Sequence, residues 1–277
     1  MKGKPERDHI AERKLWSISS ETAAVPLSLV LFLLWTAATY LLEGRIGLLR
    51  QPTLIGRWIY VVVANILIGT VAAAWVLRSL LNSRLVTLDQ LGFRPLGRTL
   101  FAVVMAAVVG FGIFLLQKPV SLESVVLLNA FAQVLQTSIA EVLVCWVVVG
   151  TSVEALIRGN SRVISLLVPI LATDLLFGIY HFSHSAPFNQ LHVAFFLMIP
   201  GLATSLIYFL GRDVYATILF HNYLGMTGVM RSVELSFLQH PLYLIYILTF
   251  ISVTGLVGIH IFLLVKGNSR DKTKRTS

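Results

Sequence analysis

About eight runs of apolar residues, each long enough to cross a lipid bilayer as a helix, constrain this chain more than any other feature. A helix rises about 1.5 Å per residue and satisfies its backbone polar groups internally, as the water-free bilayer core requires. The chain is 56% hydrophobic and 13% charged, unlike a soluble domain. We therefore predict an all-α polytopic membrane protein, a bundle of about eight transmembrane helices. The expected spans are 24–42, 58–77, 99–117, 138–157, 163–182, 191–211, 214–230 and 241–265.

No internal repeat or Pro/Ser/Gly-rich linker divides the chain, so we predict a single transmembrane domain at 23–266. A charged head at 1–22 precedes it and a basic tail at 267–277 follows it. The tract 82–100 is expected to lie along the membrane interface. The tract 121–136 has apolar residues at helical spacing, and it is either an amphipathic helix leading into the fourth span or a lengthening of that span.

The distribution of lysine and arginine indicates an orientation. Most of the 22 such residues fall on one side of the membrane if the N-terminus is inside, and cytoplasmic loops carry an excess of them. We therefore predict a multi-pass protein of the cell membrane with both termini cytoplasmic. The formal net charge is +9, and the lysines and arginines that produce it lie in the loops and tails beside the spans, where anionic lipids attract them. The expected partner of this charge is the lipid bilayer, not nucleic acid.

Ionisable side chains inside the spans are few, and each is a functional candidate because a charge in hydrocarbon costs a few kcal/mol or more. They are Glu141, Glu154, Asp174, His181, His192, His221 and His260. Counted upward from the loop at 158–162, Glu141 lies roughly 25 Å and His181 roughly 27 Å along their helices, near one level. His221 comes out at about 12 Å, a mismatch that helix tilt has to absorb.

A glutamate and two histidines in a wet cavity form a minimal hydrolytic set. The carboxylate can take a proton from water, one histidine can orient that water, and the other can donate to the oxyanion. The same three side chains, Glu141, His181 and His221, could instead bind a divalent metal such as zinc. The sequence does not separate these mechanisms, and it indicates no dissociable organic cofactor.

Three short motifs on successive apolar helices carry a resemblance. "EVLVCW" begins at Glu141, "FGIYH" places Phe177 one helical turn before His181, and "HNYLG" begins at His221. They resemble the motifs Glu-Glu-x-x-x-Arg, Phe-x-x-x-His and His-x-x-x-Asn of the CPBP family, the type II CAAX prenyl endopeptidases and bacteriocin-processing proteases. The resemblance covers about 138–226 and implies a bundle of mostly eight membrane helices.

The resemblance further implies an intramembrane endopeptidase that acts on a peptide or protein substrate. In that family pattern Glu141 and His181 activate water, and His221 lies on the oxyanion side. The possible supporting residues are Phe177, Asn222, Asp174 and His184.

The chain departs from the family pattern at three positions. Val142 and Trp146 replace the second glutamate and the arginine, and Gly225 stands where the asparagine is expected, with Asn222 as a possible substitute. These departures favour a first alternative, a non-catalytic immunity or accessory protein of the same fold. A second alternative is a small-molecule or proton-coupled transporter, since the intramembrane acids and histidines can relay protons.

A rival register of the first motif is "VEALIRG", which keeps Glu154 and Arg158. Glu154 lies only about 6 Å from the inner loop, at the opposite end from His181. We therefore favour Glu141 as the acid. Glu154 and Arg158 are four residues apart on one helix, the spacing of a supporting ion pair.

Two further residues near the second motif have structural interpretations. His184 follows the helix end between Ser183 and Ser185, and we expect a solvated loop residue there. Asp174 lies two turns before His181 on the same helix face. It either supports His181 or contacts Asn65 or another helix.

Overall fold

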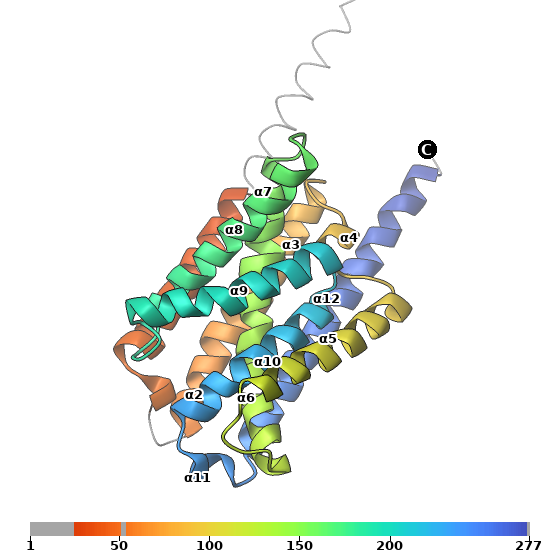
Figure 1. Cartoon of the computed structure of the whole chain (residues 1–277). Coiled ribbons are helices and arrows are strands. Elements are labelled where there is room, and N and C mark those ends of the chain that lie inside the picture. The colour runs from red at the N-terminus through yellow and green to blue at the C-terminus, as the bar shows by residue number, and fades with distance from the viewer. Residues whose placement is uncertain (1–24, 51–53, 276–277) are drawn as a thin grey trace, which may run out of the picture.

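The chain is an all-α polytopic membrane protein, shown by a computed structural model that describes residues 25–50 and 54–275 (Figure 1). No strand occurs among the described residues, and the predicted head at 1–22 lies outside them. Seven helices of the described part are long and apolar enough to cross a membrane. They are Val25–Arg45, Ile55–Asn82, Leu88–Leu116, Ser124–Leu156, Arg162–Ser183, Leu191–Gly211 and Tyr243–Val265.

Several spans are built from more than one helical segment. After the helix that begins at Val25, the segments in chain order are η1 (Tyr40–Arg45), η2 (Leu48–Arg50), α2 (Leu54–Tyr60), η3 (Val61–Ala72), α3 (Ala73–Asn82), α4 (Leu88–Leu91), α5 (Leu96–Leu116), α6 (Ser124–Glu141), η4 (Val142–Gly150), α7 (Thr151–Leu156), α8 (Arg162–Tyr180), η5 (His181–Ser183), α9 (Leu191–Gly211), α10 (Val214–Ser232), α11 (Leu235–Leu238) and α12 (Tyr243–Arg275). Segments η1, η3 and η4 have the wider turns of a π-helix.

The predicted span at 214–230, the seventh of the eight, corresponds to α10. Its 19 residues rise about 28 Å, enough to cross the bilayer core. Polar side chains such as His221 and Asn222 lower its hydropathy, and both are buried inside the protein. Helix α10 is therefore a membrane-length helix that packs its polar face against other helices.

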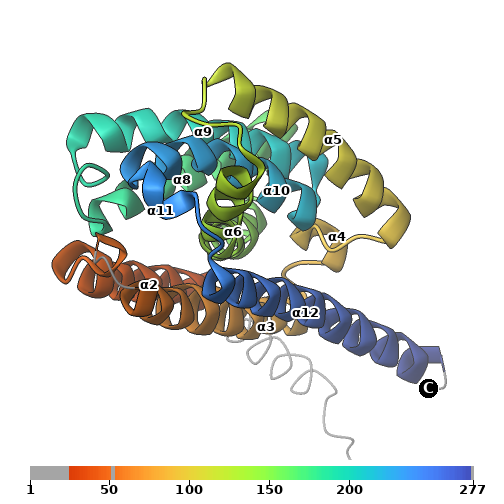
Figure 2. The ribbon, with the colours of Figure 1, turned by 90° about the horizontal axis from the view of Figure 1, so that it is seen from below.

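The span α6–η4–α7 is the centre of the bundle. In an apolar 18-residue stretch of this span, 78% of the residues are buried within the protein, against 17% in the corresponding stretch of the span that contains α5. Viewed from below, α2, α3 and α12 lie in one layer, and α5, α8, α9 and α10 lie on the other side of α6 (Figure 2). In Figure 1, α9, α10 and α5 cross α6 obliquely. This tilt brings residues together that a count along upright helices places at different depths.

Both tracts outside the predicted spans contain helical segments. The tract 121–136 is a lengthening of the fourth span, because α6 begins at Ser124 and continues without a break through η4 to Leu156. The tract 82–100 holds the short helix α4 and the first turn of α5. At the C-terminus, α12 extends the last span as a helix to Arg275.

Asp213 fixes the start of α10, and so the level of His221. Its Oδ1 accepts a hydrogen bond of 2.9 Å from the Ala216 backbone N–H, as an N-cap residue does. Its Oδ2 accepts one of 2.7 Å from the Thr99 hydroxyl in the first turn of α5. The start of α10 is thereby joined to the start of α5.

Gly69→Ala is expected to destabilise the fold by roughly 1–3 kcal/mol, the usual cost of overpacking. A Cβ at Gly69 in η3 would lie 2.4 Å from the Cβ of Ala140, so η3 and α6 would have to separate. Thermal unfolding of the purified protein in detergent measures the effect. Gly112→Ala on α5 is the control, because nothing lies within 4 Å of its Cβ position. Equal unfolding midpoints for the two variants would contradict this close approach.

Candidate functional site

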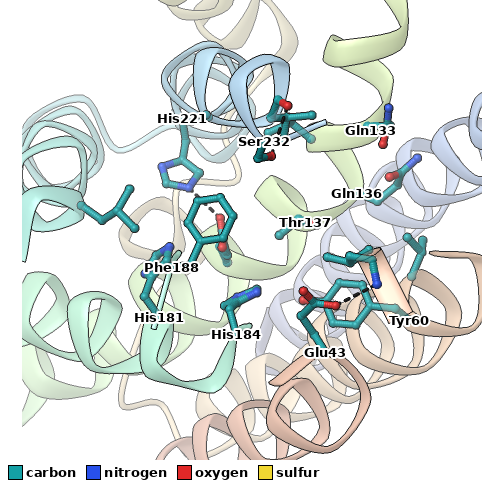
Figure 3. A pocket seen from close by; sticks show the side chains of 18 of the residues that line it. Glu43, Tyr60, Gln133, Gln136, Thr137, His181, His184, Phe188, His221 and Ser232 are labelled. Atoms are coloured by element: carbon teal, nitrogen blue, oxygen red, sulfur yellow. Dashed lines mark hydrogen bonds and ion pairs between the residues drawn. The ribbon is translucent and has the colours of Figure 1, made fainter. Parts of the chain in front are cut away.

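A cavity of about 200 Å³ lies within the bundle, and Glu141, His181 and His221 all line it (Figure 3). Because one water occupies about 30 Å³ in the liquid, the cavity has room for several waters or for part of a ligand. The side chains come from α6, η5 and α10, in agreement with the expectation that these three residues meet. Gly225, where the family pattern has asparagine, also lines the cavity.

Glu141 and His221 form a direct pair. The Nε2 of His221 lies 2.8 Å from Oε2 of Glu141, and both side chains are buried. On its other side, Nδ1 of His221 lies 2.9 Å from the hydroxyl oxygen of Thr204, whose own proton goes to the Pro200 carbonyl at 2.8 Å. The hydroxyl oxygen therefore accepts from His221, which puts a proton on Nδ1. One further proton is then shared along the Nε2–Oε2 axis.

His181 differs from His221 because its hydrogen bond is to a backbone carbonyl and not to Glu141. Its Nδ1 lies 2.8 Å from the Phe177 carbonyl oxygen, which can only accept, so Nδ1 carries the proton. In the neutral ring, Nε2 is then an acceptor. A water in the cavity can donate to this nitrogen.

Aromatic side chains enclose the His221 ring. The ring centroids of Trp146 and Phe177 lie 5.2 and 5.3 Å from that of His221. The Trp146 indole N–H donates to the Ser205 hydroxyl at 2.7 Å, so this fully buried residue is satisfied. At the position of the family's arginine, this chain has a side chain that packs against the histidine and carries no charge.

His184 is buried and lines the cavity, so the prediction of a solvated loop residue was wrong. Its ring stacks on His181 with centroids 5.6 Å apart. The loop that carries it folds against the end of the first span, where Glu43 accepts a hydrogen bond of 2.6 Å from the Ser185 hydroxyl. A Cβ at Gly44 would lie only 2.4 Å from the Ser183 carbonyl oxygen, so the two segments are in close contact.

Asn222 and Asp174 do not line the cavity. The Asn222 amide faces α6, where its oxygen accepts from the Ser138 hydroxyl at 3.3 Å, so it does not take the place of the missing asparagine. Asp174 packs against α9: a Cβ at Gly201 would lie 2.6 Å from its Oδ1. The suggested partner Asn65 instead donates to Thr137 at 2.9 Å.

The predicted Glu154–Arg158 ion pair was wrong. Glu154 pairs with Arg212 at the end of α9, and Arg158 donates to the Leu85 carbonyl at 2.7 Å. Both residues connect the end of the fourth span to neighbouring segments. The spacing of residues along one helix does not reveal such partners on other segments. Glu154 does not line the cavity, so the rival register does not meet His181 there.

As they are arranged, the three candidate metal ligands do not fit a metal site. Among the described residues, no group of three or more His, Cys, Asp or Glu side chains is placed to hold a metal ion. Nε2 of His221 and Oε2 of Glu141 face each other at hydrogen-bond distance instead of converging on a common point.

Sequence reasoning missed Thr204, Glu43, Tyr60 and Arg57, of which the last three line the cavity. Glu43 lay just outside the predicted first span, whereas the helix continues in π-helical turns to Arg45 and buries this acid to 1% exposure. The position of Glu43 directly after an apolar run could have indicated that the helix continues and buries this acid. Thr204 gave none, because hydroxyl residues are common in membrane helices.

Comparisons of the chain with protein-family models, with curated proteins and with solved structures find no match.

Proposed function

We propose that the chain is an intramembrane endopeptidase, resembling the type II CAAX and bacteriocin-processing proteases, that hydrolyses a peptide bond in this cavity. The observation that carries the proposal is the pairing of Glu141 with His221 beside a His181 ring whose Nε2 is an acceptor. Amide hydrolysis needs a group that takes a proton from water, an acceptor that orients this water and an N–H donor for the oxyanion, and Glu141, His181 and His221 can supply them in turn.

In the proposed reaction, water donates to Nε2 of His181 and to the Glu141 carboxylate. As its oxygen bonds to the peptide carbonyl carbon, the water loses a proton to Glu141. Uptake of this proton removes the negative charge that holds the Nε2–H of His221, and this N–H then donates to the oxyanion. Collapse of the tetrahedral intermediate breaks the C–N bond, and the leaving amine recovers the proton from Glu141. No step is assigned to a metal, because the arrangement does not fit one.

The substrate class that suits this cavity is an apolar peptide in contact with the lipid bilayer. Apolar side chains such as Val61, Leu197 and Leu224 line the cavity alongside the polar ones.

We place the protein in the cell membrane with both termini cytoplasmic, on the distribution of its lysines and arginines. A reporter fused to the C-terminus tests this orientation, and an external signal would contradict it.

The direct test is incubation of the purified protein in detergent with a library of apolar peptides, with mass spectrometry of the products. New termini at a consistent sequence support the proposal. Intact peptides after incubation with a folded protein would oppose it.

A specific observation also favours a non-catalytic peptide-binding protein of the same fold. Both ring nitrogens of His221 are engaged, Gly225 contributes no donor, and Asn222 faces α6. Peptide binding without cleavage would identify this second function.

Thr204→Val is expected to slow cleavage roughly ten- to a hundredfold, because a buried N–H without its acceptor costs about 1–3 kcal/mol. The variant removes the oxygen that accepts from Nδ1 of His221 and leaves the side-chain volume nearly unchanged. The measurement is the cleavage rate at saturating peptide. Thr204→Ser keeps the hydroxyl and is expected to retain most of the activity, and equal losses in both variants would oppose the role given to Thr204.

A further inference from the structure

The first membrane helix, which begins at Val25, buries three polar groups that take no part in the proposed reaction. They are Nε1 of Trp35 and the hydroxyl oxygens of Thr36 and Thr39, and none has a hydrogen-bond partner among the described residues. Their spacing places all three on one side of the helix. A polar group left unpaired away from water costs about 1–3 kcal/mol, so three together require a ligand that pairs with them.

Other hydroxyl side chains show that Thr36 and Thr39 could have been satisfied by their own helix. A helical serine or threonine can donate to the backbone carbonyl four residues earlier. Several buried hydroxyls of the other helices do so at 2.7 to 2.8 Å, namely those of Ser152, Thr173, Thr204, Thr217, Thr249 and Ser252. Thr39 has the same helical backbone, with φ −60° and ψ −46°, but makes no such bond. Its rotamer leaves the hydroxyl for another partner.

Tyr60 and Tyr180 bring two further hydroxyls to the same place. The Thr39 hydroxyl lies beside both without a direct hydrogen bond to either, and the Tyr180 ring stacks on Trp35 with centroids 3.9 Å apart. The two tyrosine oxygens are 3.4 Å apart, which is longer than the usual O–H···O distance of about 2.7–2.8 Å. Only one of their two protons can lie between them, so the other needs a further acceptor.

Water is the ligand that suits this set of groups. The indole N–H only donates, whereas a hydroxyl both donates and accepts, so the ligand has to accept as well as donate. A buried water makes about three hydrogen bonds and joins polar groups that the protein itself leaves unpaired. A lipid chain would satisfy none of them.

We propose that ordered water is bound in a buried site behind the cavity wall, by five side chains that we call the water site: Trp35, Thr36, Thr39, Tyr60 and Tyr180. Trp35, Thr39 and both tyrosines are fully buried, so bulk solvent does not reach these side chains directly. The site is separate from the cavity that holds the peptide, because Tyr60 is its only member that lines that cavity.

The water site supplies the cavity with the water that is consumed in hydrolysis. Tyr60 connects the two compartments, since it lines the cavity beside Glu43 (Figure 3). Tyr180 directly precedes His181, and both tyrosine hydroxyls lie close enough to Glu141 to interact with its charge. A hydrolase within the bilayer needs such a supply because the hydrocarbon core holds no water. This role rests on the proposed hydrolysis, whereas the binding of water does not.

The direct test is X-ray footprinting of the full-length protein in detergent and heavy-oxygen water. Brief exposure converts water into hydroxyl radicals, and a radical formed from bound water oxidises the side chain beside it, which mass spectrometry locates. We expect Trp35 and Tyr180 to be oxidised roughly tenfold faster than Trp146 and Tyr208. These two matched controls are fully buried aromatic residues outside the cavity lining, and each has a protein partner for its polar atom.

Thr39→Val removes one hydroxyl of the water site and nearly keeps the shape of the side chain. It is expected to lower the oxidation rates of Trp35 and Tyr180 by roughly threefold to tenfold, because the water loses one of its partners. The matched control is Thr217→Val, since the Thr217 hydroxyl already donates to the Asp213 carbonyl at 2.7 Å on its own helix. The control is expected to leave both rates unchanged.

Peptide cleavage by the same variants tests the supply of water. In Thr39→Val we expect kcat to fall roughly threefold to tenfold with KM unchanged, because Thr39 is outside the cavity lining and does not contact the peptide. In Thr217→Val we expect both constants to stay at their wild-type values.

Oxidation of Trp35 and Tyr180 in the wild-type protein at the rates of Trp146 and Tyr208 would overturn the water site. An unchanged kcat in Thr39→Val protein that has lost the rapid oxidation would overturn the supply role. If Trp35 and Tyr180 are oxidised rapidly but the protein never cleaves a peptide, the water site stands and the proposed hydrolysis fails.

Discussion

Glu141→Gln and His181→Ala are each expected to lower the rate of peptide cleavage by roughly 10² to 10⁴, the range attributed to general acid–base catalysis. The glutamine keeps the size of the side chain and an oxygen that can accept from His221, so the pair can persist. It cannot take the proton of the attacking water. His181→Ala removes the nitrogen that orients that water.

The measurement is the single-turnover cleavage rate of a peptide that the wild-type protein cuts, with thermal unfolding as a check on folding. Glu123→Gln is the matched control, because Glu123 precedes the same helix α6 and is exposed to solvent. The control is expected to retain wild-type activity. Retention of more than about a tenth of the wild-type rate in folded Glu141→Gln protein would remove Glu141 from the catalytic role.

The fold could be predicted from the sequence because the bilayer leaves few choices. Apolar runs of sufficient length must form helices there, and seven such helices occur among the described residues. Because a charge inside the membrane is costly, only a few residues were candidates for the site. Glu141 and His181 were selected among them because they lie at about the same level along their helices. The structure brings both to one cavity, with His221.

The contacts between helices could not be predicted in the same way. Counting along upright helices put His221 at a different level from Glu141, yet oblique crossing of α10 and α6 brings the two side chains within 2.8 Å. The same reason explains why Glu154 pairs with Arg212 on another helix. His184 is buried because the first span extends past its apolar run and covers the loop, and hydropathy alone does not reveal this.

Gly225→Asn is the variant expected to increase activity. Gly225 lies one helical turn after His221 and lines the cavity, where the family pattern has a side-chain amide donor. A Cβ at this position would lie 2.8 Å from Cγ1 of Val134, so the substitution needs the Val134→Ala change to make room. The double variant is expected to cleave roughly 10 to 10² times faster than Val134→Ala alone. This gain is smaller than the 10² to 10³ that an evolved oxyanion donor contributes, because its placement is not optimised.

The control that separates hydrogen bonding from packing is Gly225→Leu in the same Val134→Ala background, since leucine has a similar shape and no N–H. If both double variants have the same cleavage rate, the N–H does not reach the oxyanion. If the natural chain cleaves nothing and Gly225→Asn with Val134→Ala does, the pair of Glu141 and His221 is competent and lacks only a donor. That result would assign the natural chain to peptide binding and explain its inactivity by a single missing side chain.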